Sequence, residues 1–226
     1  MMKKAIVFLV TLGVVSSGAM GASLINDGDF ESPTPIISGS YTAGSSPYGQ
    51  WLGSAVWQKV YGDLNGFTNA YASHAQYSDV KLVQAFDPAA SGITAGTPLR
   101  LTFDYILQNA YNGQVSVVGL NDGQRILTYG GGAVEGDHIL SPQDLEETSG
   151  WVRGVTQNMT VQENYDSIAV VFTFSADTEG QRGIDNVELD KVDNSTGAMP
   201  EPLTIVGLMA ALGGMGGYMR KRRQQT

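Results

Sequence analysis

The chain has 226 residues, no cysteine and a formal net charge of −9 at pH 7. The absence of cysteine excludes thiol catalysis, thiolate metal sites and small folds held by disulfides. Between residues 23 and 198, seven Lys and Arg face 21 Asp and Glu, a balance of −14, and because such a surface repels phosphate backbones, no nucleic-acid partner is expected.

The N-terminus has the three parts of a secretory signal peptide. Lys3 and Lys4 precede an apolar run at residues 5–15, and small residues follow at 16–19. The run has 11 residues, too few for a permanent anchor, because a spanning helix needs about 20. We expect signal peptidase to remove residues 1–22 by cleaving near Gly21 or Ala22, and the mature protein to be exported.

The central region has an all-β pattern, because short runs of β-branched and aromatic residues alternate with Gly, Asn, Asp and Ser clusters. Most runs alternate apolar and polar side chains, which predicts one buried face per strand. The expected strands are residues 23–30, 55–60, 80–86, 99–107, 114–120, 125–129, 152–161, 167–174 and 183–190. Because no helix-length connections separate them, the pattern favours one antiparallel β-sandwich or jelly roll over residues 23–192.

Two local features are predicted between these strands. The tripeptide Asn121-Asp122-Gly123 is a hairpin signal, because Asn and Gly tolerate the positive φ of tight turns, and it should join neighbouring antiparallel strands. Residues 142–148 are expected to form one short helix on a loop.

Catalytic motifs are absent from the sequence. The two histidines, His74 and His138, lie in no nucleophile motif and not at metal-ligand spacing, so both are expected on the surface or in loops. A glycan-active enzyme stays open as an alternative, because two carboxylates facing across a cleft cannot be singled out among the acids of this chain. We predict a protein without catalytic residues.

Aromatic and amide side chains provide candidates for sugar binding, because sugar rings stack on aromatic faces while their hydroxyls need polar partners. The candidate glycan residues, all in loop-like sequence, are Tyr48, Trp51, Asn109 and Tyr111. The aromatic residues predicted to be inward-facing core are Trp57, Tyr105 and Trp151.

Two motifs at the ends of the central region resemble the opening and closing strands of galactose-binding-like jelly rolls, a fold of many carbohydrate-binding modules. They are Asn-Asp-Gly-Asp-Phe-Glu at 26–31 and Gly-Ile-Asp-Asn-Val-Glu-Leu at 183–189. The resemblance implies a structural Ca²⁺ bound by Glu31 and Asp185, with Asp29 or Asp190 as a further ligand. The alternative is a pair of solvated acids at the strand ends. No cofactor is required.

The C-terminus consists of a linker at 193–199, the motif Pro200-Glu201-Pro202, an apolar segment at 203–219, and a basic cluster. The basic cluster is Arg220, Lys221, Arg222 and Arg223. The apolar segment has the minimum length for a transmembrane helix, and the cluster would hold its end in the cytoplasm. A core helix is the alternative, which five glycines and four adjacent cations disfavour.

The order of these parts over residues 200–226 resembles the PEP-CTERM sorting signal. This resemblance implies transient anchoring in the inner membrane, processing by an exosortase, and delivery to the cell surface or extracellular matrix. The expected function is therefore a non-catalytic carbohydrate-binding β-sandwich associated with exopolysaccharide or biofilm. The alternative is a structural matrix or adhesion protein without a glycan site. The sugar, the metal, tail cleavage and the oligomeric state are left open.

Overall fold

The computed structural model describes residues 23–44, 48–54, 57–61, 70–74, 80–108, 112–128, 133–175 and 182–192, which all belong to one compact unit. These residues form thirteen strands and, within this described part, no helix. The strands are β1 (Ile37–Ser38), β2 (Tyr41–Thr42), β3 (Trp51–Gly53), β4 (Trp57–Tyr61), β5 (Ala70–His74), β6 (Val80–Phe86), β7 (Pro98–Leu107), β8 (Asn112–Leu120), β9 (Arg125–Ile126), β10 (Asp137–Leu145), β11 (Val152–Thr160), β12 (Ser167–Ser175) and β13 (Arg182–Lys191).

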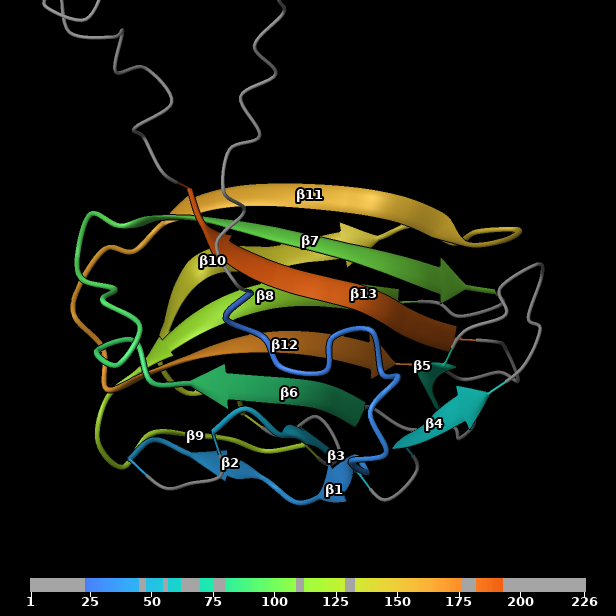
Figure 1. The fold of residues 1–226 in the computed structure, drawn as a ribbon, viewed down its shortest axis with the longest axis horizontal. Coiled ribbons are helices and arrows are strands. Elements are labelled where there is room, and N and C mark those ends of the chain that lie inside the picture. The colour runs from blue at the N-terminus through green and yellow to red at the C-terminus, as the bar shows by residue number, and fades with distance from the viewer. Residues whose placement is uncertain are drawn as a thin grey trace, which may run out of the picture. The chain divides into compact units, whose positions relative to one another are not determined.

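The strands form two main sheets and one ribbon. A six-stranded sheet has the order β1-β3-β6-β12-β8-β10, and a five-stranded sheet has the order β11-β7-β13-β5-β4 (Figure 1). The strand β1 pairs with β3 in parallel, while the long central strands pair antiparallel. A two-stranded ribbon pairs β2 with β9. The predicted all-β class and antiparallel sandwich are confirmed.

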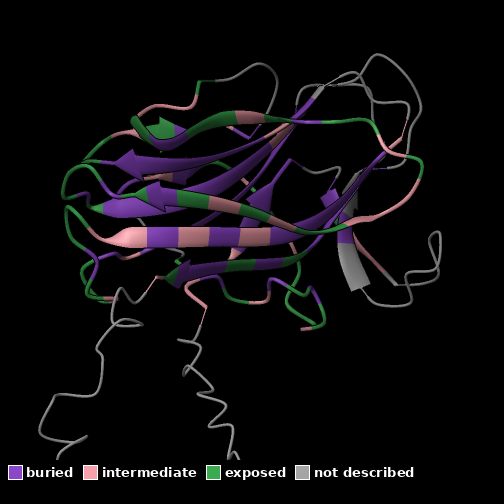
Figure 2. Ribbon diagram, turned by 90° about the horizontal axis from the view of Figure 1, so that it is seen from above, coloured by how far each residue is buried: buried purple, intermediate pink, exposed green. Residues whose placement is uncertain are grey.

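The main core lies between the facing sides of the two sheets. Phe103 of β7 meets Phe172 of β12 edge to face, with ring centroids 5.3 Å apart, and both side chains are fully buried. Trp57 of β4 packs on Phe174 of β12 with centroids 5.7 Å apart. Figure 2 shows the buried residues gathered along the strands. Each buried large side chain contributes about 2 kcal/mol of hydrophobic stabilisation, so this layer holds the sandwich together.

A second core covers the outer face of the six-stranded sheet. Val83, Val118 and Val171, from the three central strands, pack there against Tyr41 and Ile126 of the β2–β9 ribbon. The expectation of one buried face per strand is therefore wrong for β6, β8 and β12. These strands lie between two apolar layers, so their sequences are apolar on both faces.

Several predicted strands match observed ones closely. The runs at 80–86, 99–107, 114–120, 152–161, 167–174 and 183–190 correspond to β6, β7, β8, β11, β12 and β13. In β7 the predicted alternation is confirmed from Leu99 to Phe103, where Arg100 and Thr102 are half-buried between buried residues, but it is wrong from Asp104 onward, because residues 104–107 are all buried.

Other predicted elements are wrong. Residues 23–30 are not a strand but a chain of bends and turns. The helix expected at 142–148 is absent, because residues up to Leu145 form the edge strand β10, where a proline without an N–H is tolerated. The strands β1, β2, β3, β5 and β10 were not predicted.

The Asn121-Asp122-Gly123 tripeptide does form a tight turn, but not a hairpin between neighbouring strands. The Gln124 amide donates to the Asn121 carbonyl at 3.0 Å, and Gly123 has φ +79°. The turn leads from β8 into β9, which pairs with β2 instead of β8. The chain thus leaves the sheet at this turn to build the second core.

Both histidines lie on strands, whereas the predicted signal peptide, linker and sorting tail lie outside the described residues. Of the histidines, His74 is on β5, and His138 is exposed on β10. In the described part of the chain, no helix has the length and apolar character needed to span a membrane. The signal peptide at 1–22, the linker at 193–199 and the sorting tail at 200–226 lie outside the described residues, so they stay predictions.

Candidate ligand pocket at the opening segment

An open pocket of about 600 Å³ lies beside the opening segment, defined here as residues 23–34. Most of its lining side chains carry hydroxyl, amide or carboxylate groups. The lining residues are Asn26, Asp27, Asp29, Glu31, Ser32, Thr34, Pro35, Gly49, Gln50 and Trp51. Ligand pockets typically have volumes of about 300–1,000 Å³, so this one has room for a small saccharide.

Backbone hydrogen bonds fix the opening segment to β13. The Leu24 amide donates to the Leu189 carbonyl at 2.8 Å, and the Val187 amide donates to the Gly28 carbonyl at 2.9 Å. A side chain at position 28 would place its Cβ only 1.9 Å from the Val187 carbonyl oxygen. Glycine is therefore required here, because it alone lets the two backbones approach this closely. The motifs at 26–31 and 183–189 therefore lie side by side.

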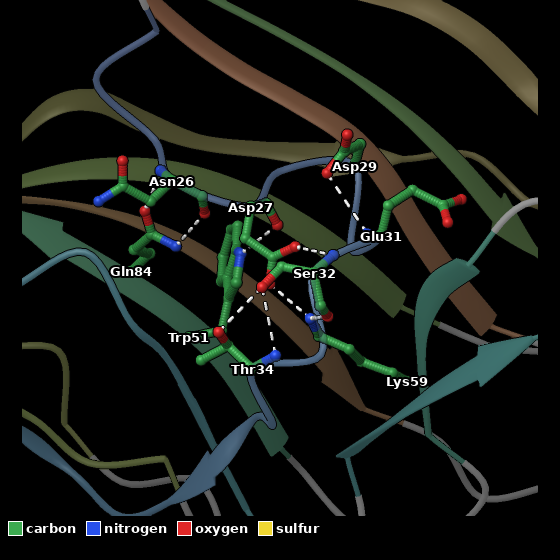
Figure 3. Close-up of polar contacts among 9 residues, drawn as sticks. All are labelled: Asn26, Asp27, Asp29, Glu31, Ser32, Thr34, Trp51, Lys59 and Gln84. Carbon is green, nitrogen blue, oxygen red and sulfur yellow. Dashed lines mark hydrogen bonds and ion pairs between the residues drawn. The ribbon is translucent and has the colours of Figure 1, made fainter.

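A buried glutamine ties the opening segment to the other sheet. The Gln84 side chain of β6 is fully buried. Its Oε1 accepts from the Asn26 amide at 2.7 Å, and its Nε2 donates to the Asn26 carbonyl at 2.8 Å (Figure 3). The glutamine thus satisfies both backbone groups of Asn26. One wall of the pocket is consequently anchored to both sheets.

A buried ion pair sets the shape of the loop that follows. The Lys59 ammonium of β4 donates to Asp27 Oδ2 and, at 2.6 Å, to the Ser32 carbonyl, and the Lys59 side chain is 8% exposed. The other Asp27 oxygen, Oδ1, accepts from the Ser32 amide at 2.9 Å. One tethered cation thus closes the turn from 27 to 32 (Figure 3).

The floor of the pocket is aromatic. The Trp51 indole is 3% exposed; its Nε1 donates to the Asp27 carbonyl at 3.0 Å, and its ring packs against Phe30 with centroids 5.2 Å apart. Asp27 and Phe30 have φ of +52° and +53°. Such left-handed conformations cost about 1–3 kcal/mol each in non-glycine residues, so the surrounding contacts must hold the loop in place.

The buried carboxylate of Asp185, on β13, has an unusual environment. Its Oδ1 accepts from the Asn186 amide at 2.8 Å, while its Oδ2 has no hydrogen-bond partner among the described residues. Burial is the main cause that raises the pKa of Asp185 from 3.8 to about 7, and the nearby carboxylates of Asp104, Asp29 and Glu31 contribute to this rise against the lowering effect of the Asn186 bond. This site therefore favours either a proton or a cation.

The predicted calcium ligands fit this environment in part. The unpaired Asp185 oxygen and the nearby Glu31 and Asp29 offer the carboxylate oxygens that Ca²⁺ prefers. Asp190 instead lies 3.7 Å from Arg100 in an ion pair. Across the described ranges, no three His, Cys, Asp or Glu side chains gather as a metal-binding group. A calcium site at Glu31 and Asp185 thus stays a prediction.

The structure separates the predicted glycan residues. Trp51 lines the pocket, but it opens β3 and is buried in the core, so its expected loop position is wrong. Tyr48 is 37% exposed and its hydroxyl donates to the Asp166 carbonyl at 3.3 Å. Asn109 and Tyr111 lie outside the described residues. Of the aromatics predicted to be core, Trp57 and Tyr105 are buried, and Trp151 is half-buried.

Sequence reasoning missed most residues that shape the pocket. The motif at 26–31 was interpreted as a fold signature with Glu31 and Asp29 as candidate calcium ligands, whereas its residues Asn26, Asp27, Asp29 and Glu31 line the pocket. Gln50, Thr34 and Lys59 carried no sequence signal, because their roles depend on contacts between segments distant in the chain.

No family model matches the sequence, and no curated protein matches it. Among solved structures, the chain is similar to a family 4 carbohydrate-binding module, with 15% identity, a TM-score of 0.49, and coverage of 74% of this chain and 99% of that one. It is also similar to a family 61 module solved with β-1,4-galactotriose, with 10% identity, a TM-score of 0.46, and coverage of 75% and 99%.

A third similar structure is the enzymatically active domain of tailspike protein 4 from bacteriophage CBA120, with 13% identity and a TM-score of 0.48. The match covers 75% of this chain but 21% of that one, so this chain spans about a fifth of the tailspike domain's length. At these identities and TM-scores, the likenesses carry no argument about what this chain binds.

Proposed function

We propose that this protein binds a saccharide, without catalysis, in the pocket beside the opening segment. The observation that carries the proposal is the pocket itself: about 600 Å³, open, and lined mainly by polar side chains. Ser32, Thr34, Asn26 and Gln50 can each donate and accept hydrogen bonds. Sugar hydroxyls also do both, so this lining suits them.

The charge of the pocket indicates which saccharides it accepts. The carboxylate of Asp27 is paired with Lys59, while the carboxylate of Asp29 is exposed on the lining. Like charges repel strongly where water is partly excluded. The proposed ligand is therefore a neutral saccharide or one with amino groups, and uronates are excluded.

Exchange of pocket side chains should weaken saccharide binding. We expect the double variant Asp29→Ala/Gln50→Ala to lower affinity at least tenfold, because it removes two hydrogen-bonding side chains and each lost hydrogen bond to a sugar costs about 1 kcal/mol or more. Calorimetry with neutral, amino-sugar and uronate oligosaccharides measures this effect. Trp51→Ala is unsuitable, because removing a buried tryptophan costs about 3–5 kcal/mol of stability.

Gln143→Ala is the matched control, since Gln143 lies on β10, outside the pocket lining, and its side-chain amide donates to the Ser141 and Pro142 carbonyls of the same strand. It should bind as wild type does. If no oligosaccharide binds, the proposed function fails. If uronates bind as tightly as neutral sugars, the charge argument fails and the binding function stands.

We also propose that the protein acts outside the cell, in an exopolysaccharide matrix, after its two ends are processed. This rests on the sequence patterns of residues 1–22 and 200–226. Mass spectrometry of the mature protein from cells should give termini near Ala22 and Pro200. An intact full-length mass would contradict it.

Calcium at Glu31 and Asp185 is a further part of the proposal, supported by the unpaired buried Asp185 oxygen. Bound Ca²⁺ would neutralise this carboxylate and hold the opening segment against β13.

A further inference from the structure

The edges of the two sheets differ in how they are protected from pairing with other strands. Edge strands expose unpaired N–H and C=O groups, and proteins block them with short length, prolines, charges or bulges. The edge strand β10 carries Pro142, Asp137 and Asp144, and its pairing with β8 has two register shifts. The edges β1 and β4 have 2 and 5 residues.

The edge strand β11 is protected at one end only. Its register with β7 shifts between Val152 and Val155, where Gly154 has φ +65° and its amide donates to Asp104 Oδ1 at 2.7 Å. From Val155 to Thr160 the register is continuous. Within the described chain, β7 is the one neighbour of β11 in its sheet.

This open half of β11 lies in an uncharged stretch. Residues 154–162 read Gly-Val-Thr-Gln-Asn-Met-Thr-Val-Gln, between Arg153 and Glu163. In a region with a balance of −14, this edge is where two copies can approach without bringing like charges together. The chain contains no proline or lysine there, although those residues are the usual protection.

We propose that two copies of this chain pair through β11, antiparallel and edge to edge, so that their five-stranded sheets join into one. An isologous pairing centred on Asn158 places Asn158 opposite itself. Within the continuous stretch from Val155 to Thr160, the exposed positions are Thr156, Asn158 and Thr160. The centre at Asn158 places Thr156 of one copy opposite Thr160 of the partner subunit, so that all three exposed positions face uncharged residues.

Single-cysteine variants test this register, and the background is clean because the chain has no cysteine. Residues directly opposite in an antiparallel pair have Cα atoms about 4.5–5.5 Å apart, within the range of about 4.4–6.8 Å that disulfides span. Full-length Asn158→Cys should therefore form a disulfide-linked dimer under mild oxidation. Thr156→Cys and Thr160→Cys alone should not, but a mixture of the two should, because they face each other.

A charge variant tests the association itself. Asn158 is exposed, so Asn158→Lys should leave the fold intact, and it puts two like charges opposite each other. By sedimentation equilibrium we expect a wild-type dimer, strengthened by salt because salt screens the acidic surfaces, and at least tenfold weaker dimerisation of Asn158→Lys. Ser141→Lys, exposed on β10, is the matched control and should dimerise as wild type does.

Three results would overturn the proposal. They are a wild-type protein that stays monomeric at about 100 µM, well above the K_d expected for a specific interface, equal dimerisation of Asn158→Lys and wild type, and equal cross-linking from all three cysteine positions. A dimer mediated by another surface gives the second or third result, so it is distinguished from pairing through β11.

Discussion

Asp185→Asn is expected to raise the stability of the chelator-treated protein at pH 8 by about 4 kcal/mol while changing it little at pH 4. Burial raises the pKa of Asp185 from 3.8 to about 7 in the folded protein. One pKa unit corresponds to about 1.36 kcal/mol, so ionising this fully buried carboxylate costs the folded state that amount. Asparagine keeps the shape and the accepting oxygen but carries no charge.

The sign of the pH dependence follows from proton binding. Between pH 4 and pH 7 the folded protein holds the Asp185 proton while the unfolded chain has released it, so stability falls as the pH rises through this range. Above pH 7 both states are ionised and this contribution is constant. Urea unfolding of wild type and variant across the range measures it, and about 4 kcal/mol corresponds to roughly 10 °C in melting temperature for a domain of this size.

Two further arms separate this titration from the proposed calcium site. Asp137→Asn changes an exposed carboxylate on β10 and should leave the pH dependence as in wild type. Adding Ca²⁺ at pH 8 should stabilise wild type but not Asp185→Asn, because the ion requires the ionised carboxylate. An equal effect of Ca²⁺ on both proteins, or none on wild type, rejects calcium at this site and leaves the titration prediction standing.

The long strands could be predicted from the sequence because their side chains carry the pattern of burial. In the first half of β7, buried Leu99, Leu101 and Phe103 alternate with half-buried residues. This period of two is typical of a strand and not of a helix. Short strands could not be predicted, because they have too few residues to show a pattern of burial. The strand β1 has 2 residues, both exposed, and it exists because it pairs with β3.

The second core and the pocket could not be predicted, since each depends on contacts between distant segments. Ile126 lies in a predicted strand and Tyr41 outside one, but nothing in the sequence indicates that β2 pairs with β9 over the outer face of the six-stranded sheet. Gln84 is a polar residue in a predicted strand, and its sequence position does not indicate burial. It is buried because its side chain hydrogen-bonds the backbone amide and carbonyl of Asn26. The motifs at 26–31 and 183–189 predicted that the first and last segments of the domain lie together. They did not predict the loop shape that Lys59 imposes through Asp27 and the Ser32 carbonyl.

Lys59→Met is expected to destabilise the protein by about 3 kcal/mol, because removing one partner of a buried ion pair leaves the other charge uncompensated. The side chains of Lys59 and Asp27 are 8% and 13% exposed. The Ser32 carbonyl would lose its donor as well. Because the opening segment contains two residues with positive φ, loss of this cation should also loosen the pocket and weaken saccharide binding at least tenfold. Urea unfolding and calorimetry measure the two effects.

The double variant Asp27→Asn/Lys59→Met distinguishes the cost of an uncompensated Asp27 charge from the loss of the contact between the Lys59 ammonium and the Phe30 ring. Asparagine removes the charge and keeps an oxygen for the Ser32 amide, which now bonds Asp27 Oδ1 at 2.9 Å. The double variant should therefore be more stable than Lys59→Met alone, and the double-mutant cycle gives the coupling between the two side chains. If the double variant is no more stable, the Lys59 ammonium stabilises the fold mainly through its cation–π contact with Phe30, whose ring centroid lies 5.9 Å away. Arg125→Met, which removes an exposed cation from the Glu135 pair, should cost at most about 1 kcal/mol, because water already screens that pair.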